Sequence, residues 1–187
     1  WQAVFTCRFL IFHGTLFPAI WIRLTLKDYA FSKRKRKRIA TLSDRFKTII
    51  RPFELTIEKE RLYQIYRKQF PAKIAPTVGA ALLDDSDRNI FESHEIAVYD
   101  GDELIAFSVF DLGADSLASI LGVYHPDYSN YSLGMYTMLR EIEFGIQSEF
   151  KFYYPGYVVP GYDKFNYKLQ IGPVDYFNEE HFSWESY

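Results

Sequence analysis

The most promising chemistry in the sequence lies between positions 123 and 136, where a strand is expected to lead into a long helix. The segment GVYHPDYSNYSLGMYTMLREIEF places Asp127 after a proline, and Ser132 and Gly134 at the helix start. The first amides of a helix lack intrahelical partners and carry partial positive charge, so they can bind a phosphate or a developing oxyanion. Gly134 has no Cβ, which lets a ligand approach its backbone closely.

An uninterrupted run of six cations is the second chemical signal: Lys33, Arg34, Lys35, Arg36, Lys37 and Arg38. Ser32 can cap a helix that begins at Lys33 and runs to about Thr41. In such a helix the six charges cover every face and repel one another unless an anion lies nearby. We expect this run to bind RNA phosphates, with an affinity that falls steeply as salt rises. A solvated cap, a nuclear address and an anionic membrane patch are the alternatives.

The overall charge of −2 hides a strong asymmetry along the chain. Residues 1–75 hold 17 Lys and Arg against 5 Asp and Glu, whereas residues 76–187 hold 5 Lys and Arg against 19 Asp and Glu. A length of 187 residues suits one well-packed domain, and an aromatic content of 19% excludes intrinsic disorder. We therefore expect a single domain over 1–187, with a basic lobe (1–75) and an acidic core (76–187).

Several functional classes are disfavoured by features that the sequence lacks. A lone cysteine, Cys7, excludes an internal disulfide, favours a reducing cytoplasm, and is interpreted as a small buried hydrophobe. The four histidines are too scattered for the spacing of metal ligands, so no metal site is expected. No apolar stretch is long enough to cross a membrane, and residues 1–26 do not resemble a secretory signal.

Periodicity and turn signals predict an alternation of strands and helices. In the first half we expect strands at 2–12, 19–26 and 45–57, the last at an edge or break because of Pro52, a helix at 58–69 that Pro71 ends, and a loop or short helix at 72–93. A hairpin at 95–113 around Asp100 and Gly101 and a strand at 116–127 should follow. The rest should form a long helix from about Ser132, a strand at 151–159, a short helix at 164–168 and an extended piece at 173–177. This order resembles the acyltransferase fold of the GNAT superfamily. That fold is α/β (α+β), with a mixed, mostly antiparallel sheet and flanking helices.

The junction and its surroundings also resemble a particular family. The block YHPDYS, SLGMY and LREIE resembles the YYDPDYS–SLGTY–LREIE signature of arginyl-tRNA–protein transferases and their bacterial leucyl-transferring relatives. KFYYPGYVVPGYDKFNYK is similar to the family's KYYYMGFYI and PKMRYK block, and VYDGDELIAFSVFDL is similar to its DGKLIAVGVIDIL strands. Further upstream, FPAIWIRLTLKDYAFSKRKRKRI is similar to CCPxYTIRL and PSKSQRK. The resemblance spans about residues 16–178 and is most specific over 124–168.

The chain departs from the family pattern at four positions. Leu16 and Phe17 stand where the family has a cysteine pair, and no Cys-x-x-Cys precedes them, so the family's metal or iron–sulfur site is not expected here. His125 replaces the first Asp of the Asp-Pro-Asp motif, and Asn166 replaces an Arg. The last two changes bear on substrate preference and on activity itself.

The resemblance implies transfer of an amino acid, arginine or leucine, from the 3′ end of aminoacyl-tRNA to the N-terminal amine of a protein. Such a reaction must deprotonate the amine, stabilise negative charge on the ester carbonyl and protonate the leaving ribose hydroxyl. It needs no covalent nucleophile, and the implied co-substrate is aminoacyl-tRNA with no cofactor. The implied partners are aminoacyl-tRNA and protein N-termini, with no membrane and an oligomeric state left open.

Candidate site residues follow from these requirements. The expected catalytic residues are Asp111, Asp127 and Tyr157, and the expected donor-binding residues are Ser132, Leu133, Gly134, Tyr136, Tyr154 and Lys168. The two aspartates would grip the amine or a cationic donor side chain, Tyr157 would shape the pocket or relay a proton, and Lys168 would meet phosphate. Structural interpretations stand beside these roles: Asp127 as a cap or turn residue, and the tyrosines of the strand as core or edge packing. Glu141 is expected to pair with Arg140 or with a neighbouring basic side chain of its helix.

Two other functions remain open from the sequence. An acetyl-CoA-dependent GNAT acetyltransferase would need a phosphate loop rich in glycine, and the corresponding segment from Asn130 to Tyr136 supplies one glycine. A non-catalytic tRNA-binding relative is favoured by the missing cysteines and by His125. The acidic C-terminal part favours a cationic donor or acceptor.

Overall fold

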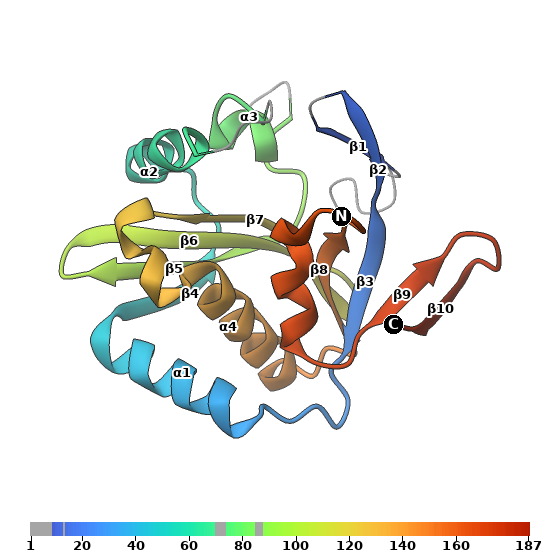
Figure 1. Ribbon diagram of the computed structural model, residues 1–187. Helices are drawn as coiled ribbons and strands as arrows, with labels where there is room; N and C mark the ends of the chain where they lie inside the picture. Colours follow the sequence, from blue (N-terminus) through green and yellow to red (C-terminus); the bar gives the residue numbers. More distant parts are fainter. Residues whose placement is uncertain (1–8, 13, 70–73, 85–87) are drawn as a thin grey trace.

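The computed structural model describes residues 9–12, 14–69, 74–84 and 88–187, so Cys7 and Pro71 lie outside the described residues. In this part of the chain, eight strands form one sheet in the order β10-β9-β3-β8-β7-β6-β5-β4, and β1 and β2 form a separate hairpin (Figure 1). All neighbouring strands are antiparallel except β7 and β8, which are parallel. The expected mixed, mostly antiparallel sheet is confirmed.

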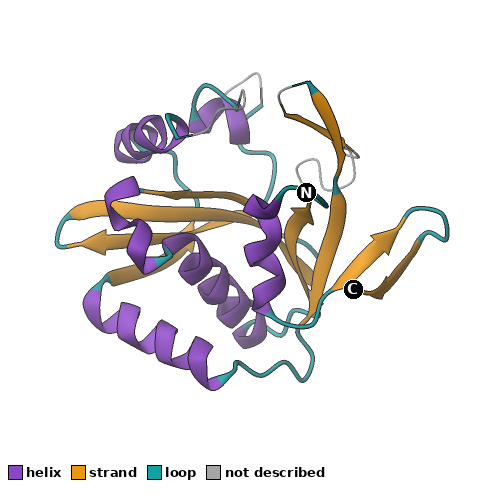
Figure 2. Cartoon of the chain, viewed as in Figure 1, coloured by secondary structure: helices purple, strands orange, loops and turns teal. Residues whose placement is uncertain are grey.

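Most elements lie close to the predicted ranges, but β2 and β10 were not predicted, and residues 2–8 of the predicted strand 2–12 lie outside the described residues. The strands are β1 Phe9–Phe12, β2 Thr15–Pro18, β3 Ile20–Thr25, β4 Lys47–Pro52, β5 Ser93–Asp100, β6 Glu103–Leu112, β7 Ser116–Tyr124, β8 Phe152–Val158, β9 Asp175–Asn178 and β10 Ser183–Ser186. The helices are α1 Lys33–Arg45, α2 Ile57–Arg67, α3 Val78–Leu82 and α4 Leu133–Gln147, with two 3₁₀ segments, η1 Pro126–Tyr131 and η2 Asp163–Ile171 (Figure 2). Pro52 ends β4, an edge strand, as its missing N–H requires.

Helices cover both faces of the sheet. On one face, α1 and α4 pack on apolar side chains of the strands, including Ile96, Phe110 and Leu117 (Figure 1). On the other face, α2 and α3 bury a separate cluster around Tyr63 and Phe107. The basic first 75 residues are not a separate body, because they contribute β3 and β4 to the same sheet as the acidic remainder. No helix in the described part of the chain is long and apolar enough to cross a membrane.

The sheet divides between β7 and β8. These strands pair only where Ser116–Ala118 faces Phe152–Tyr154, and beyond that point β8 continues beside β3 up to Val158. A register shift in the β6–β7 pairing at the same level places an extra residue, Ile120, in β7. The far halves of β7 and β8 therefore diverge, and the space between them is available to side chains and ligands.

Candidate functional site

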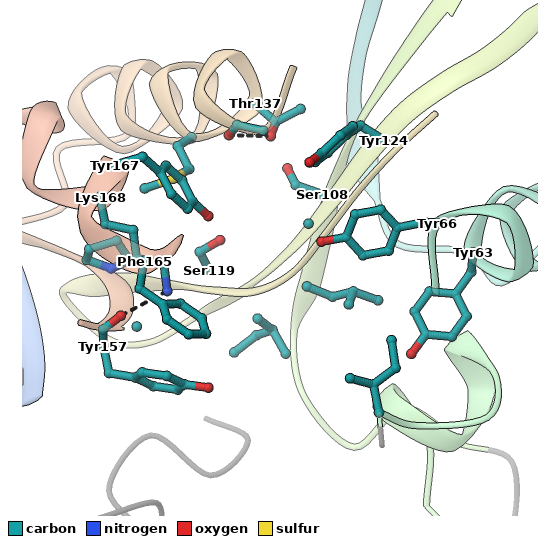
Figure 3. Close-up of a pocket in the computed structure, with 18 of the residues that line it drawn as sticks. Tyr63, Tyr66, Ser108, Ser119, Tyr124, Thr137, Tyr157, Phe165, Tyr167 and Lys168 are labelled. Atoms are coloured by element: carbon teal, nitrogen blue, oxygen red, sulfur yellow. Dashed lines mark hydrogen bonds between the residues drawn. The ribbon is translucent and has the colours of Figure 1, made fainter. Parts of the chain in front are cut away.

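The divergence of β7 and β8 opens into a cavity of about 470 Å³, here called the aromatic pocket (Figure 3). Its lining comes from both diverging strands, from β6, α2, α4 and η2. The residues are Trp21, Tyr63, Tyr66, Ile74, Ser108, Ser119, Ile120, Leu121, Gly122, Tyr124, Gly134, Thr137, Met138, Pro155, Gly156, Tyr157, Phe165, Tyr167 and Lys168. A pocket of this composition suits an apolar group with a few polar contacts.

Helix α2 forms one wall of the aromatic pocket and is held firmly to the sheet. Thr56 caps the helix by accepting a hydrogen bond from the Lys59 amide (3.3 Å). The buried amine of Lys59 lies 2.7 Å from the buried carboxylate of Glu95 on β5, which Arg51 also contacts at 2.8 Å. Separating this buried pair would leave an uncompensated charge in the core, which costs free energy. The contact therefore holds α2, and with it Tyr66, against the sheet.

The floor of the pocket conceals a carboxylic acid. Glu141 on α4 is fully buried, and its Oε2 accepts a hydrogen bond from the Tyr153 hydroxyl (2.7 Å). Its Oε1 and the hydroxyl of Ser108 are buried without such a partner among the described residues. Burial raises the pKa of Glu141 to about 7, although the nearby hydroxyls of Ser108, Tyr153 and Ser119 and the charge of Lys168 favour the ionised form.

Lys168 reaches the pocket from η2, on the side opposite α2 (Figure 3). Its amine lies 5.0 Å from the ring centroid of Tyr157 and 5.4 Å from that of Phe165, and it donates a hydrogen bond to the Tyr157 carbonyl (3.2 Å). Burial lowers the pKa of Lys168 to about 8, and the charge of Glu141 opposes this shift. A substantial fraction of the lysine is therefore neutral at slightly alkaline pH.

A second cavity of about 500 Å³, here called the basic cavity, adjoins the first. It is lined by Arg34, Arg38, Tyr66, Tyr124, Ser129, Ser132, Leu133, Gly134, Met135, Lys164, Phe165, Tyr167, Lys168 and Gln170. Tyr66, Tyr124, Gly134, Phe165, Tyr167 and Lys168 border both cavities. The two cavities therefore meet at the start of α4.

The N-terminus of α4 opens into the basic cavity without a side-chain cap. Ser132 occupies the capping position in a left-handed conformation (φ 52°, ψ 51°), and its hydroxyl makes no capping hydrogen bond. The first turn contains no acidic residue. An anion in the basic cavity would therefore meet both the partial positive charge of the helix and the guanidinium groups of Arg34 and Arg38.

The six-cation run forms the first turns of α1, capped by Ser32 as predicted. Its members face different ways: Arg34 and Arg38, one helical turn apart, line the basic cavity, whereas Lys35 donates to the Ile171 carbonyl (2.6 Å). Arg36 donates to the Phe31 carbonyl (2.6 Å). The predicted run and the predicted junction are thus brought together, although almost a hundred residues separate them in sequence.

Five of the nine predicted catalytic and donor-binding residues line the cavities. Ser132 and Leu133 border the basic cavity, Tyr157 borders the aromatic pocket, and Gly134 and Lys168 border both. An added Cβ on Gly134 would lie 3.8 Å from the Tyr124 ring, so the glycine leaves its backbone open without being required by packing.

The other four predicted residues lie outside both cavities. Tyr136 is buried, and its hydroxyl hydrogen bonds with Ser43 (2.9 Å) and Thr48 (2.8 Å) on the α1 side of the core. Tyr154 packs against Trp184 (ring centroids 5.5 Å apart) on a different part of the sheet.

The two aspartates are separated from the junction for topological reasons. Asp111 lies near the C-terminal end of β6, opposite Ala118, while the junction follows the far end of β7 at Tyr124. The Ser93 hydroxyl donates to the buried Asp111 carboxylate. The Asp127 side chain is 84% exposed and lies 3.8 Å from His125. The ring of His125 caps η1 by accepting a hydrogen bond from the Asp127 amide (3.3 Å), so Asp127 is a residue of the first turn and not its cap.

The sequence interpretation missed the acid beneath the pocket. Arg140 pairs with Glu143 (3.0 Å), so the expected pairing of Glu141 with Arg140 is wrong. The helical spacing of Gly134, Met138, Glu141 and Gly145 was an available signal, because residues three and four apart share one face. In the described ranges, no three His, Cys, Asp or Glu side chains gather as a metal site would require.

Sequence comparison agrees with this geometry. A profile described as "Arginine-tRNA-protein transferase, C terminus" matches residues 58–178, which is more than half of the chain. The chain belongs to the arginine-tRNA-protein transferase family. An aspartate/glutamate leucyltransferase of this kind from Leptospira interrogans is 30% identical over 158 residues, covering 81% of this chain and 61% of that protein. Arginyl-tRNA–protein transferase 1 of Saccharomyces cerevisiae is 35% identical over 79 residues, covering 42% of this chain and 16% of that protein.

Several solved structures share the fold of this member of the arginine-tRNA-protein transferase family. The C-terminal domain of a putative lysylphosphatidylglycerol synthetase from Agrobacterium fabrum has a TM-score of 0.64 at 8% identity, covering 90% of this chain and 57% of that one. A GCN5-related glucosamine N-acetyltransferase region of a fungal enzyme has a TM-score of 0.54 at 13% identity, covering 84% and 19%. The expected GNAT-like fold is confirmed. The chain spans about three-fifths of the length of the bacterial relatives it matches.

Proposed function

We propose that this chain transfers the aminoacyl group of an aminoacyl-tRNA to the N-terminal amine of an acceptor protein. The observation that carries the proposal is the junction of the two cavities at Gly134. A charged aminoacyl-tRNA end has the same layout: phosphates, then an ester, then an amino-acid side chain. The basic cavity suits the first part and the aromatic pocket suits the last.

The ester would lie between these two parts, at the start of α4. In that position the unpaired amides of the first turn can donate to the carbonyl oxygen as it gains negative charge. Arg34, Arg38 and Lys164 would contact the terminal phosphates of the RNA. The reaction needs no cofactor besides aminoacyl-tRNA, and we assign it to the cytoplasm.

The walls of the aromatic pocket favour leucine over arginine as the transferred residue. The lining side chains are aromatic, aliphatic or hydroxyl-bearing, apart from the cation Lys168. A guanidinium group would face this cation, and the described lining of the pocket contains no acidic side chain to pair with it. The name aspartate/glutamate leucyltransferase, carried by the Leptospira interrogans relative, supports leucine and adds acidic N-terminal residues as acceptors.

A transfer assay tests the proposal directly. The full 187-residue chain is incubated with radiolabelled Leu-tRNA or Arg-tRNA and with peptides that begin with Asp, Glu, Lys or Arg. We expect leucine to be incorporated into peptides that begin with Asp or Glu. Turnover of acetyl-CoA in a parallel assay, or tight tRNA binding without label in any peptide, would overturn the proposal in favour of an acetyltransferase or a non-catalytic relative.

A further inference from the structure

Lys168 lies at the opening between the two cavities, where the proposed function places the ester bond of the donor. It is the one cation in the described lining that both cavities share, and Gly134 borders the same opening. Its amine donates a hydrogen bond to the Tyr157 carbonyl and rests against the rings of Tyr157 and Phe165. An added Cβ on Gly156 would lie 3.1 Å from this amine, so the glycine leaves the room that Lys168 uses.

The surroundings of Lys168 suit proton transfer better than permanent charge. Glu141 on α4 is the acid whose charge acts on it, and the phenols of Tyr66, Tyr124, Tyr157 and Tyr167 line the same space. Arg34 and Arg38 on α1 and Lys164 on η2 line the basic cavity beside it. Burial already lowers the pKa of Lys168 to about 8. A lysine with such a pKa exchanges a proton readily near neutral pH.

On the basis of the proposed function, we propose that Lys168 is the catalytic residue that carries the proton between the acceptor amine and the ribose oxygen. Neutral Lys168 takes a proton from the amine as the new N–C bond forms at the ester carbonyl. The ammonium of Lys168 then gives this proton to the ribose oxygen as the C–O bond breaks. The products are an amide and a free ribose hydroxyl, so no other acid, base or cofactor is consumed.

This role differs from the phosphate contact that the sequence suggests for Lys168. A phosphate contact requires a permanent cation, which arginine supplies as well as lysine does. A proton carrier requires a group that can lose its proton, which arginine does not do in proteins. Arginine also stacks on aromatic rings, so Lys168→Arg preserves the packing against Tyr157 and Phe165 while removing the proposed chemistry.

The test compares Lys168→Arg with wild type under single turnover. We expect the transfer rate at pH 7.5 to fall by about a hundredfold or more, since a positioned acid–base group contributes about 10²–10⁴-fold. The affinity for tRNA should stay within about threefold, because the charge is retained. Lys151→Arg is the matched control: it makes the same change on an exposed lysine outside both cavities, and both the transfer rate and tRNA affinity should stay close to wild type.

The pH profile separates Lys168 from the acceptor amine, which titrates in the same range. We expect the wild-type transfer rate to rise with pH through about 8. In Glu141→Gln this rise should move to lower pH, because the acid that raises the pKa of Lys168 is gone, whereas the pKa of a free peptide amine is unaffected. Wild-type rates and an unshifted profile in these variants would overturn the role of Lys168, while a wild-type chain that transfers nothing would overturn the proposed function instead.

Discussion

The aromatic pocket and the basic cavity adjoin, but they are built in different ways. The aromatic pocket exists because two neighbouring strands stop pairing and leave room for rings from α2 and η2. The basic cavity exists because two helix starts, α1 and α4, lie near each other with no acid in the first turn of either. Backbone divergence creates an apolar space, whereas the uncapped start of α4 beside Arg34 and Arg38 creates a site for negative charge.

The two cavities also differ in whether their charged side chains change protonation state near neutral pH. In the basic cavity the charges of Arg34 and Arg38 are permanent at any physiological pH. Around the aromatic pocket, burial moves the pKa of Glu141 to about 7 and that of Lys168 to about 8, so both can change charge near neutrality. One space is therefore suited to holding an anion and the other to moving a proton. The variants below separate these two properties.

Reversing the charge of the basic cavity should have the largest effect. In the double variant Arg34→Glu/Arg38→Glu we expect tRNA affinity at low salt to fall by about a hundredfold or more, because phosphate contacts dominate RNA binding. Binding is measured by filter retention or fluorescence anisotropy over a salt series. The control Lys33→Glu/Lys37→Glu changes the net charge equally on exposed positions outside the cavity. Equal losses in both variants would show that only the overall charge of α1 matters.

Filling the aromatic pocket should impair transfer while tRNA binding persists. A Cβ added to Gly122 on β7 meets no atom within 4 Å, so Gly122→Leu has room for its first carbon and adds apolar bulk to the lining of the pocket. We expect kcat/KM for transfer to fall by about thirtyfold and tRNA affinity to change by less than about threefold, with a melting temperature no lower than wild type. Parallel loss of binding and transfer would mean that the two cavities do not serve separate parts of the donor.

Adding one methyl group where the cavities meet should give a smaller loss. Gly134→Ala places its Cβ at an ordinary 3.8 Å from Tyr124, and alanine favours a helix over glycine by about 1 kcal/mol. We expect stability to be unchanged or higher, and kcat/KM to fall by about tenfold because the donor approaches this backbone. Gly145→Ala is the opposite case, since its Cβ would lie 2.7 Å from Leu117 and should lower stability. Full activity in Gly134→Ala would remove the helix start from the site.

The smallest effects are expected outside both cavities. Asp127→Asn changes an exposed side chain, and Tyr154→Phe removes a hydroxyl on a different part of the sheet. We expect each variant to retain kcat/KM within about twofold, measured in the same transfer assay. A loss of tenfold or more in Asp127→Asn would show that η1 takes part in the site.

Local signals in the sequence were sufficient for most of the elements. The Asp100-Gly101 pair marks the turn between β5 and β6, where Gly101 takes a φ of 60°, and Ser32 marks the start of α1. The place where α4 begins was also predictable, since Ser132 and Gly134 follow a strand and a turn that starts with Pro126. These features depend on neighbours within a few residues.

The errors concern partners that are distant in sequence. Asp111 does lie near a strand end, but antiparallel pairing places the C-terminal end of β6 beside the start of β7 and away from the junction. Tyr136 faces α1 instead of a cavity because α1 packs against α4, which no local pattern shows. The sequence predicts that Glu141 pairs with a basic side chain of its own helix, whereas it is fully buried against Tyr153 on β8, a burial that is rare for glutamate.

The short pairing of β7 with β8 has a mechanical consequence. Only three residues of each strand face one another, so few backbone hydrogen bonds join the two halves of the sheet. Helix α4 contacts both strands and thereby spans the seam between them. We therefore expect the distance between the two halves to depend on the side chains by which α4 packs on both strands, so that a substitution there changes the width of the opening without touching its lining.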